Sequence, residues 1–398
     1  MRIGLFSPGW PARAVANGIA AYVEILRDAL RAQGHEVVVL SPREWILPDA
    51  PGAVAPIAPS LAFRAGRWLR KRLGRTRPNL VDDAAIIARC AAAAVRRHRL
   101  DVLEVEESFG FAAEVAAAAG VPVVVKLHGP AFLLAPEADA ADAAHALRVA
   151  REGVGLAAAA AVLAPSQVTL DLTLARYQLR PHLARRVPNP MPMPAGPTWS
   201  PAGADPNRLL YVGRFEPVKG GDFALAAFAR VLARRPQVRL WYVGHDRGVP
   251  GPDGRPRRFA EHVAAELPAT VRERVDYLGV LPNAELAALR RRAGVVIVPS
   301  RYETQSYAAL EAMALGCPVA AFAVGGLAEA VRDGATGLAA APGDIDALAA
   351  AALRLLADPV LASRLGAGAR DHVAVAHAPD AIARATAEVY AAAIAARG

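Results

Sequence analysis

Short runs of apolar and β-branched residues alternate with longer helical stretches along the whole chain. In the first half these runs fall at residues 2–6, 36–40, 101–105, 122–127 and 161–165, and in the second at 208–213, 238–244, 274–279, 295–300, 318–322 and 336–340. Strands separated by helices pair in parallel, because each helix carries the chain back to the edge where the next strand starts. The pattern predicts an α/β protein with doubly wound parallel sheets.

A proline-rich segment divides the chain of 398 residues into two halves. Residues 188–207 contain seven prolines, which lack an amide donor and fix φ, so this segment is predicted to be a semi-rigid linker. The chain is also too long for a single hydrophobic core. We expect Rossmann-like domains over 1–187 and 208–378, and a C-terminal helix over 379–398 that crosses back to the first domain.

The net charge of +9 comes almost wholly from arginine, since Lys71, Lys126 and Lys219 are the only lysines. The charge is concentrated at residues 64–77, half of which are basic. Such a run suits an ordinary solvated helix, an anionic membrane surface or an acidic substrate. Trp68 is the one aromatic residue within it, so no nucleic acid is expected as a partner.

No export signal is expected, because the opening MRIGLFSPGW has one basic residue and reaches a Pro-Gly turn before any long apolar run. No segment is apolar for long enough to be predicted as a membrane span. Cys90 and Cys317 lie in apolar surroundings without metal-ligand spacing, which suits a reducing compartment. A cytoplasmic location is expected, and the basic run leaves open a peripheral position at the inner membrane face.

Two cations follow the first strand of the second half. In YVGRFEPVKGGD (211–222) the strand ends at Gly213, and Arg214 and Lys219 lie in a loop that leads into a helix. The free amides and the dipole of a helix start favour phosphate, so a pyrophosphate is predicted here. Two solvated basic residues would give the same pattern, and the Walker spacing Gly-x4-Gly-Lys-Ser/Thr is absent.

Two glutamates, Glu303 and Glu311, flank the start of a predicted helix in SRYETQSYAALEAMAL (300–315). Glu303 lies in the loop after a buried strand, beside the unpaired amides of the first turn, and Glu311 lies inside the helix. An ionised carboxylate has only acceptor sites and suits the hydroxyls of a ribose or a sugar ring. Together with the cations, this arrangement predicts a nucleotide-sugar site at the carboxyl ends of the strands. Two helix-surface glutamates would have the same spacing.

These motifs closely resemble those of the retaining, nucleotide-sugar-dependent glycosyltransferases of family 4. The similarity covers almost the whole chain, through NGIAAYVEILRDALRAQGHEVVVL (17–40), VVKLHGP (124–130), APSQVTLDLTLARY (164–177), VPNP (187–190), LEAMALGCPV (310–319) and GGLAEAVRDGATGL (325–338). It implies the GT-B fold, in which two Rossmann-like doubly wound parallel-sheet domains face a central cleft. The first domain would bind the acceptor and the second the donor.

The resemblance also implies roles for single residues. Arg214 and Lys219 would hold the donor pyrophosphate and stabilise the departing nucleoside diphosphate. Glu311 would bind the ribose, and Glu303 the transferred sugar.

Further donor contacts are implied in both halves. Gly18 would let the first-domain loop approach the phosphates, and His128 would reach the transferred sugar. The base would lie near residues 277–281, which include Leu278. The remaining contacts would come from Gly213 and from the backbone amides of Gln305, Ser306 and Tyr307.

The chain departs from the family pattern after the first glutamate. Many members have Gly-Phe-Gly there, whereas this chain has Thr304, Gln305 and Ser306, so a more polar sugar pocket is expected. Asp344 and Asp346 have the spacing of a divalent-ion motif, but they follow Pro-Gly and open a helix, where aspartate is a favoured N-cap. No cofactor and no metal are predicted, because the two cations can do the leaving-group work of a metal.

The predicted reaction is transfer of a sugar from a nucleotide sugar, with UDP favoured, to a hydroxyl-type acceptor by front-face attack and with retention. The acceptor is expected to be a glycan, a lipid-linked molecule or a small molecule. A phosphorylase or nucleotide-sugar epimerase of the same fold is the nearest alternative, and a non-catalytic sugar-binding protein is another. A dinucleotide-dependent oxidoreductase would normally carry Gly-x-Gly-x-x-Gly after its first strand, which this chain lacks.

Overall fold

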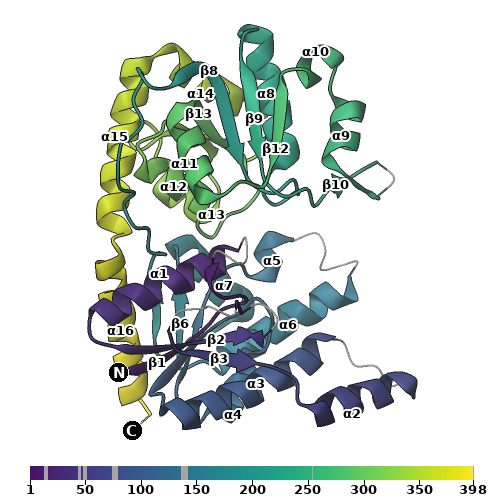
Figure 1. The fold of residues 1–398 in the computed structure, drawn as a ribbon, viewed down its shortest axis with the longest axis vertical. Helices are drawn as coiled ribbons and strands as arrows, with labels where there is room; N and C mark the ends of the chain where they lie inside the picture. Colours follow the sequence, from purple (N-terminus) through teal and green to yellow (C-terminus); the bar gives the residue numbers. More distant parts are fainter. Residues whose placement is uncertain are drawn as a thin grey trace. The chain divides into compact units, whose positions relative to one another are not determined.

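The computed structural model describes residues 1–12, 17–43, 46–47, 52–73, 79–135, 142–252 and 254–397. The chain forms two compact units (Figure 1). Unit 1 comprises Met1–Pro190 together with Pro379–Gly398, and unit 2 comprises Met191–Ala378. Each unit contains one parallel sheet, as the alternation of strands and helices predicts.

Within the described ranges, unit 1 has a seven-stranded parallel sheet in the order β3-β2-β1-β4-β5-β6-β7. Its strands are β1 (Arg2–Phe6), β2 (Glu36–Pro42), β3 (Val54–Ile57), β4 (Val102–Glu106), β5 (Val123–Lys126), β6 (Ala161–Ala164) and β7 (Ala184–Arg186). Its helices are α1 (Gly18–Ala32), α2 (Leu61–Arg72), α3 (Asn79–His98), α4 (Ala112–Ala119), α5 (Ala131–Leu134), α6 (Ala143–Ala157), α7 (Gln167–Tyr177) and α16 (Pro379–Ala395).

The two faces of strand β4 show how this sheet is covered. Leu103 and Val105 belong to the apolar core shared with α3 and α4. Glu104, between them, contacts Tyr22 of α1 and Tyr390 of α16. Since successive side chains of a strand point to opposite faces, α3 and α4 cover one face, and α1 and α16 cover the other.

In the described part of unit 2, a six-stranded parallel sheet has the order β12-β9-β8-β13-β14-β15. Its strands are β8 (Asp205–Val212), β9 (Arg239–Val243), β12 (Val275–Gly279), β13 (Ala293–Val298), β14 (Val319–Phe322) and β15 (Leu338–Ala340), and β10 (Val249–Pro250) pairs antiparallel with β11 (Pro256–Arg257). Its helices are α8 (Gly221–Arg234), α9 (Phe259–Glu266), α10 (Ala269–Arg272), α11 (Asn283–Arg292), α12 (Tyr307–Ala314), α13 (Gly325–Ala330), α14 (Ile345–Ala357) and α15 (Pro359–Ala376).

The strand order of unit 2 reverses between β8 and β13. From β8 the chain adds β9 and β12 on one side, and from β13 it adds β14 and β15 on the other. The loops after β8 and β13 leave the same edge of the sheet and diverge to opposite faces, which makes this edge a topological switch point. Open α/β sheets bind ligands at such a point, and both predicted donor motifs lie there.

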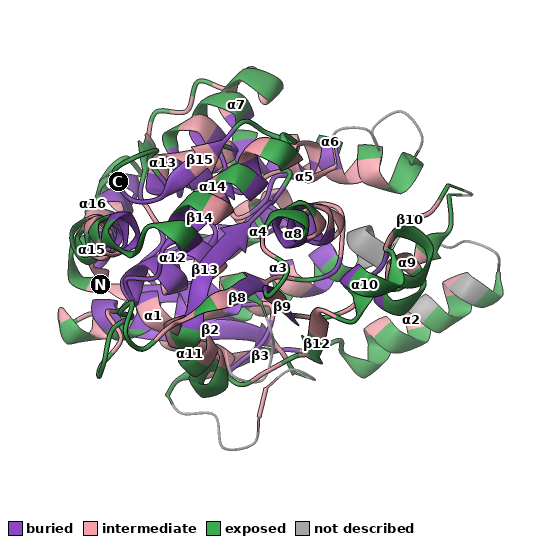
Figure 2. Cartoon of the chain, turned by 90° about the horizontal axis from the view of Figure 1, so that it is seen from above, coloured by how far each residue is buried: buried purple, intermediate pink, exposed green. Residues whose placement is uncertain are grey.

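The sequence located the six parallel strands of unit 2 and the inner strands of unit 1, but it missed the two edge strands of unit 1. The buried strands appear in Figure 2 as purple ribbons within the helical layers, and each predicted run overlaps an observed strand. The strands β3, β7, β10 and β11 were not predicted. They are two to four residues long and largely exposed or half-buried, so they lack a continuous apolar run.

The basic run falls partly on helix α2, and its residues 74–77 lie outside the described residues. Of the helices in the described ranges, none has the length and hydropathy that crossing a bilayer requires. Cys90 and Cys317 are free thiols, and Cys317 is buried.

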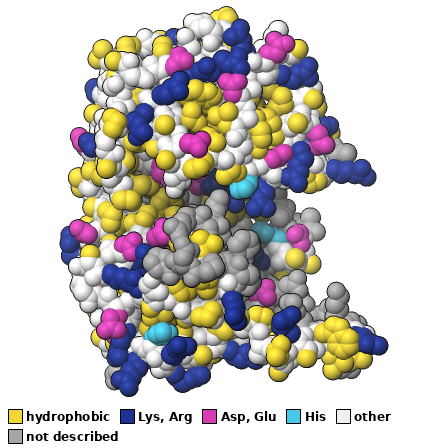
Figure 3. Space-filling model, in the orientation of Figure 1, with side chains coloured by type: hydrophobic (Ala, Val, Ile, Leu, Met, Phe, Trp, Pro, Cys, Tyr) yellow, Lys and Arg dark blue, Asp and Glu magenta, His cyan; other side chains and the backbone are white. Residues whose placement is uncertain are grey.

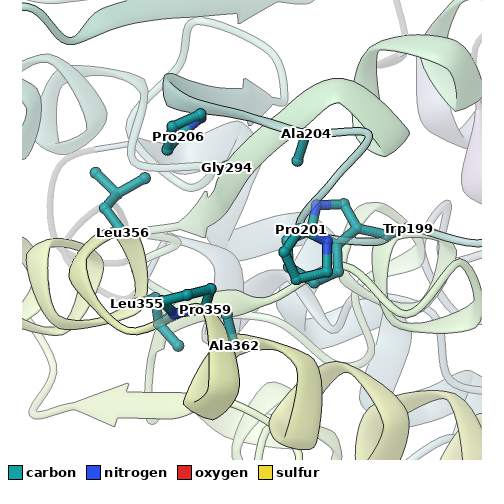
Figure 4. A pocket seen from close by; sticks show the side chains of 9 residues that line it. All are labelled: Trp199, Pro201, Ala204, Pro206, Gly294, Leu355, Leu356, Pro359 and Ala362. Carbon is teal, nitrogen blue, oxygen red and sulfur yellow. The ribbon is translucent and has the colours of Figure 1, made fainter.

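Most of the segment predicted to be a linker, residues 191–207, belongs to unit 2, and residues 205–207 form the start of β8. Within this segment, the Trp199 indole Nε1 donates to the Ala293 carbonyl at 2.7 Å. Beside it lies a small apolar cavity of about 50 Å³ (Figure 4). Its lining residues are Trp199, Pro201, Ala204, Pro206, Gly294, Leu355, Leu356, Pro359 and Ala362. Because Gly294 is at the start of β13, this cavity lies at the amino end of the sheet, away from the switch-point loops.

Candidate functional site

The loop of residues 213–220, called here the cation loop, connects β8 to α8. The buried Tyr211 hydroxyl lies 3.0 Å from the Arg214 carbonyl and 3.1 Å from the Lys219 carbonyl. One side chain thereby ties both parts of the loop to the sheet. Gly220 closes the loop with φ of +64° and caps α8. The strand end and helix start agree with the sequence prediction.

The loop of residues 299–306, called here the donor loop after its predicted role, follows β13 and packs on the cation loop. The Arg301 amide donates to the Val218 carbonyl at 2.9 Å. A Cβ atom on Gly220 would lie 1.8 Å from the Pro299 carbonyl oxygen, so only glycine allows this approach. Ser306 caps helix α12, with its side chain accepting from the Ala309 amide. The helix therefore begins at Tyr307, beside the predicted sugar-binding amides.

Lys219 and Glu303 join the two loops by an ion pair. Lys219 Nζ donates to Oε1 and Oε2 of Glu303 at 2.8 and 2.9 Å. The Ser300 hydroxyl donates to the same Oε1 at 3.0 Å. The Glu303 side chain is 5% exposed and that of Lys219 29%, so the cation keeps an accessible side and the carboxylate is enclosed. The structure thus brings together a predicted phosphate ligand and a predicted sugar ligand.

Arg214 is the more exposed cation of the loop. Its guanidinium pairs with Glu216 at 2.7 Å, and its side chain is 44% exposed. Glu216 was not singled out in the sequence, because a carboxylate two residues from an arginine is common in surface loops. The ion pair restrains the Arg214 side chain against the cation loop, which also carries Lys219.

Glu311 has a partner that the sequence did not predict. Arg290, in the last turn of α11, is 3% exposed and donates to Glu311 Oε2. The run Arg290 to Arg292 looks like an ordinary charged helix end, and only tertiary packing selects the buried member. Arg290 thereby fixes the position of the Glu311 carboxylate on helix α12, which follows the donor loop.

The predicted base region lies at the carboxyl end of β12. Tyr277, Leu278 and Val280 are 39%, 37% and 52% exposed. The Tyr277 ring stacks on Phe259 at 4.3 Å. The Gly244 amide, at the end of β9, donates to the Gly279 carbonyl, so this region adjoins the cation loop along one sheet edge. It offers an apolar face to a flat ligand.

Gly18, the predicted phosphate-approach residue of unit 1, is the first residue of helix α1. Asn17 caps the helix by accepting from the Ile19 amide at 2.8 Å. Asn17 therefore has a definite structural role at this helix start. Residues 13–16 of the predicted glycine loop lie outside the described residues.

His128 follows β5, and its surroundings keep it neutral. Its backbone amide donates to Glu107 Oε2 at 2.9 Å, and its ring packs edge-on against Tyr22. Desolvation and, next, the nearby Lys126 lower the pKa of His128 to about 3. With a pKa this low, the His128 imidazole can donate or accept a hydrogen bond but is a poor proton acceptor at neutral pH.

Three buried glutamates at the end of β4, Glu104, Glu106 and Glu107, were not predicted as special. Glu107 accepts from the amides of His128 and Gly129, and so shapes the loop after β5. Both carboxyl oxygens of Glu106 are buried without a hydrogen-bond partner, and burial raises its pKa well above 4.5. The sequence signal that could have identified them is the presence of glutamates within the otherwise apolar strand DVLEVEES (101–108).

Asp344 and Asp346 each have another partner in the structure. Asp344 caps α14 by accepting from the Ala347 amide at 2.9 Å, as predicted. Asp346 pairs with Arg230 on α8. Among the residues that the structure describes, no group of three or more His, Cys, Asp or Glu is placed to hold a metal ion.

Two family matches divide the chain as the fold does. Residues 16–193 match the family described as Glycosyltransferase Family 4, and residues 206–358 match the family described as Glycosyl transferases group 1. The chain belongs to the family 4 glycosyltransferases.

Relatives of this family 4 glycosyltransferase include glycogen synthase from Mycobacterium tuberculosis (strain CDC 1551 / Oshkosh), 37% identical over 188 residues, which are 47% of this chain and 43% of that protein. D-inositol 3-phosphate glycosyltransferase from Thermobispora bispora is 40% identical over 173 residues, which are 43% of this chain and 40% of that protein. The matched segments therefore span less than half of these relatives' own lengths.

Solved structures share the fold over nearly the whole chain. Sucrose-phosphate synthase from Thermosynechococcus elongatus is 26% identical, with a TM-score of 0.79 and 99% of both chains covered. HepE from Anabaena in complex with UDP-glucose is 19% identical, with a TM-score of 0.69 and coverage of 98% of this chain and 100% of that chain. The fold of this glycosyltransferase is therefore GT-B, as expected from the sequence.

Proposed function

We propose that the protein transfers a sugar, in the manner of a hexosyltransferase, from a nucleotide sugar to a hydroxyl-type acceptor with retention of configuration. The observation that carries this proposal is the joining of the cation loop and the donor loop by Lys219 and Glu303 at the switch point of unit 2. UDP is the nucleotide proposed, and HepE, which shares the fold and was solved with UDP-glucose, makes it the first to test.

Residues near the carboxyl edge of the unit 2 sheet are each assigned to one part of such a donor. The base packs on the exposed face of Tyr277 and Leu278, and the ribose hydroxyls bind Glu311. The diphosphate lies against Arg214 and Lys219, which face it with positive charge and adjoin the start of α8. The donor sugar meets Glu303. The donor-loop amides of Gln305, Ser306 and Tyr307 complete the unit 2 part of the site, with Gly213 at its border.

The reaction follows a front-face route. The bond between the sugar C1 and the phosphate oxygen breaks, and its electron pair stays on the leaving phosphate. The acceptor oxygen bonds to C1 from the same face, while its proton passes to that phosphate oxygen. Arg214 and Lys219 stabilise the negative charge that develops there, each by on the order of 3 kcal/mol of barrier. Glu303, held by Lys219 and Ser300, binds the sugar and does not attack C1.

Steady-state kinetics of alanine variants tests the donor assignment. Arg214→Ala and Lys219→Ala should each lower kcat/KM about a hundredfold. Arg230→Ala is the matched control, because it also removes an arginine ion pair from unit 2, between exposed side chains. Near-normal turnover in the Arg214→Ala, Lys219→Ala double variant would refute the assignment.

The product's chemistry separates the proposal from its enzymatic alternatives. Nuclear magnetic resonance of the glycosylated product should show the anomeric configuration of the donor. Turnover that requires inorganic phosphate would indicate a phosphorylase, and turnover without an acceptor that changes the donor sugar would indicate an epimerase. Binding of free sugar without turnover of any donor would indicate a sugar-binding protein.

The surface of helix α2 supports an anionic membrane as the second partner. Leu61, Trp68, Leu69 and Leu73 are 80%, 60%, 51% and 62% exposed. In Figure 3, yellow and dark blue side chains lie together at the lower right, where Figure 1 labels α2. The Arg72 guanidinium lies 5.2 Å from the Trp68 ring centre.

Phe63 packs on the opposite side of α2, against the core of unit 1. An apolar stripe beside arginines therefore faces away from the core, which is the pattern of a helix that lies in the lipid headgroup region. Such a position suits a lipid-linked acceptor.

Vesicle co-sedimentation tests this partner. Protein should sediment with vesicles that contain about a third phosphatidylserine and remain in the supernatant with pure phosphatidylcholine, and salt should weaken the binding. A Trp68→Ala, Leu69→Ala variant should lose the binding. Val360→Ala, which removes an exposed apolar side chain from unit 2, should keep it. Equal sedimentation of both variants would contradict the role of α2.

A further inference from the structure

The side chain of Gln305 in the donor loop is anchored on a histidine. Gln305 Nε2 lies 2.9 Å from His377 Nδ1, within hydrogen-bond distance. His377 is 3% exposed, so the contact is buried on the histidine side. Gln305 is two residues from Glu303 and directly before Ser306, the cap of α12. A bond at this position constrains both the carboxylate and the helix start.

His377 also lies where the chain passes between the two units. It caps the end of α15, with its amide donating to the Val373 carbonyl. Its own carbonyl accepts from the Met191 amide at 2.9 Å. Met191 is the first residue of unit 2 and Ala378, next to His377, is the last. One buried residue thus holds the donor loop and both ends of the unit.

We propose that His377 is a positioning residue for the donor sugar, acting through Gln305. This inference rests on the proposed function. The bond fixes the donor loop before the donor arrives, so the amides of Gln305, Ser306 and Tyr307 already face the bound sugar and phosphate. Without it, the donor itself must order the loop, and that cost is taken from the binding free energy.

The pair also accounts for the departure of this chain from the family pattern. Where many members have Gly-Phe-Gly after the first glutamate, Gln305 supplies an amide side chain. An unanchored Gln305 side chain would be free to change rotamer, and His377 removes that freedom. The polar sequence therefore produces a loop that is fixed by a specific partner.

A double-mutant cycle tests the proposal. The variants are His377→Ala, Gln305→Ala and both together, and the dissociation constant of UDP-glucose, or of the nucleotide sugar that the native protein binds best, is measured by titration calorimetry. Each single variant should weaken binding three- to tenfold, which is the loss of one hydrogen bond. The double variant should be no weaker than the weaker single variant, because both remove the same bond.

Kinetics and rescue distinguish positioning from a general loss of structure. Each variant should raise the donor KM by the same factor and change kcat less than twofold. His377→Asn should restore most of the affinity, because its amide oxygen can accept from Gln305. The inference would be overturned if the double variant lost affinity by the product of the two single fold losses, or if His377→Ala kept native affinity. Failure of the native protein to bind any nucleotide sugar would instead refute the proposed function.

Discussion

Replacing Lys219 with methionine separates the structural and chemical roles of the ion pair in unit 2. Methionine keeps an unbranched side chain but removes the ammonium group, which lies 2.8 and 2.9 Å from the two oxygens of Glu303. Removing one partner of a fully buried pair costs about 3–5 kcal/mol. Because Lys219 is 29% exposed, water can enter and solvate part of the carboxylate. We therefore expect the free energy of unfolding to fall by about 2 kcal/mol.

The same substitution should have a larger effect on the reaction than on folding. The lost cation would have faced the leaving phosphate, and a preorganised charge of this kind lowers the barrier by about 3 kcal/mol. That value corresponds to about a hundredfold in kcat/KM. The assay is the initial rate of nucleoside diphosphate release at donor concentrations below KM, at a temperature where urea titration shows the variant to be folded.

Adding Glu303→Gln to Lys219→Met isolates the cost of the unpaired charge. A neutral amide needs no cation, so the double variant should regain all but about 1 kcal/mol of stability. Its activity should stay low, because neither change restores the positive charge. Arg230→Met should change stability by less than about 0.5 kcal/mol, since its ion pair is exposed. Activity of Lys219→Met within threefold of native would refute the leaving-group role.

Four further substitutions, one of them a control, test single features of the fold. Gly220→Ala should lower the free energy of unfolding by more than about 3 kcal/mol, because φ is +64° and the new Cβ would lie 1.8 Å from the Pro299 carbonyl oxygen. The control Gly343→Ala should lower it by about 1 kcal/mol, because φ is +79° but the space around the new Cβ is open. Urea unfolding measures both values. Desolvation raises the pKa of Glu152 from 4.5 to about 8, so the folded chain keeps this carboxyl protonated where the unfolded chain ionises it. Stability should therefore fall as pH rises from 4.5 to 8, and Glu152→Gln should flatten that slope in thermal melts at several pH values. Asp344→Ala should lower the free energy of unfolding by about 1 kcal/mol, because it removes a helix cap. Addition of EDTA should leave the activity of both this variant and the native protein unchanged.

The sequence predicted the central sheet strands because a parallel strand covered on both faces is a continuous apolar run. Edge strands have no such requirement. β7 (Ala184–Arg186) has two exposed arginines, and β3 (Val54–Ile57) contains a proline, so neither carries the signal of a buried strand. Their pairing depends on the neighbouring strand, which local composition does not encode.

The candidate site was likewise only partly predictable from the sequence. Arg214, Lys219 and Glu303 could be found from motif spacing, because each lies in a loop after a predicted strand. The partner of each charge could not be found, since it is selected by tertiary distance. Glu311 pairs with Arg290 rather than with either neighbouring arginine, and only the packing of α11 on α12 decides which one is buried.

The carboxyl-terminal helix shows how a buried charge can specify a partner that apolar packing alone would not. Helix α16 is rich in alanine, so its apolar face matches many surfaces about equally well. Glu104 on β4 is 4% exposed, and burial raises its pKa, with Lys126 opposing the shift. Such a carboxyl needs donors, and Tyr22 and Tyr390 supply them at 2.9 and 2.7 Å. Any other register of α16 would leave Glu104 short of a donor at a cost of about 1–3 kcal/mol. The hydrogen bond between Glu104 and Tyr390 therefore favours one register of α16 within unit 1.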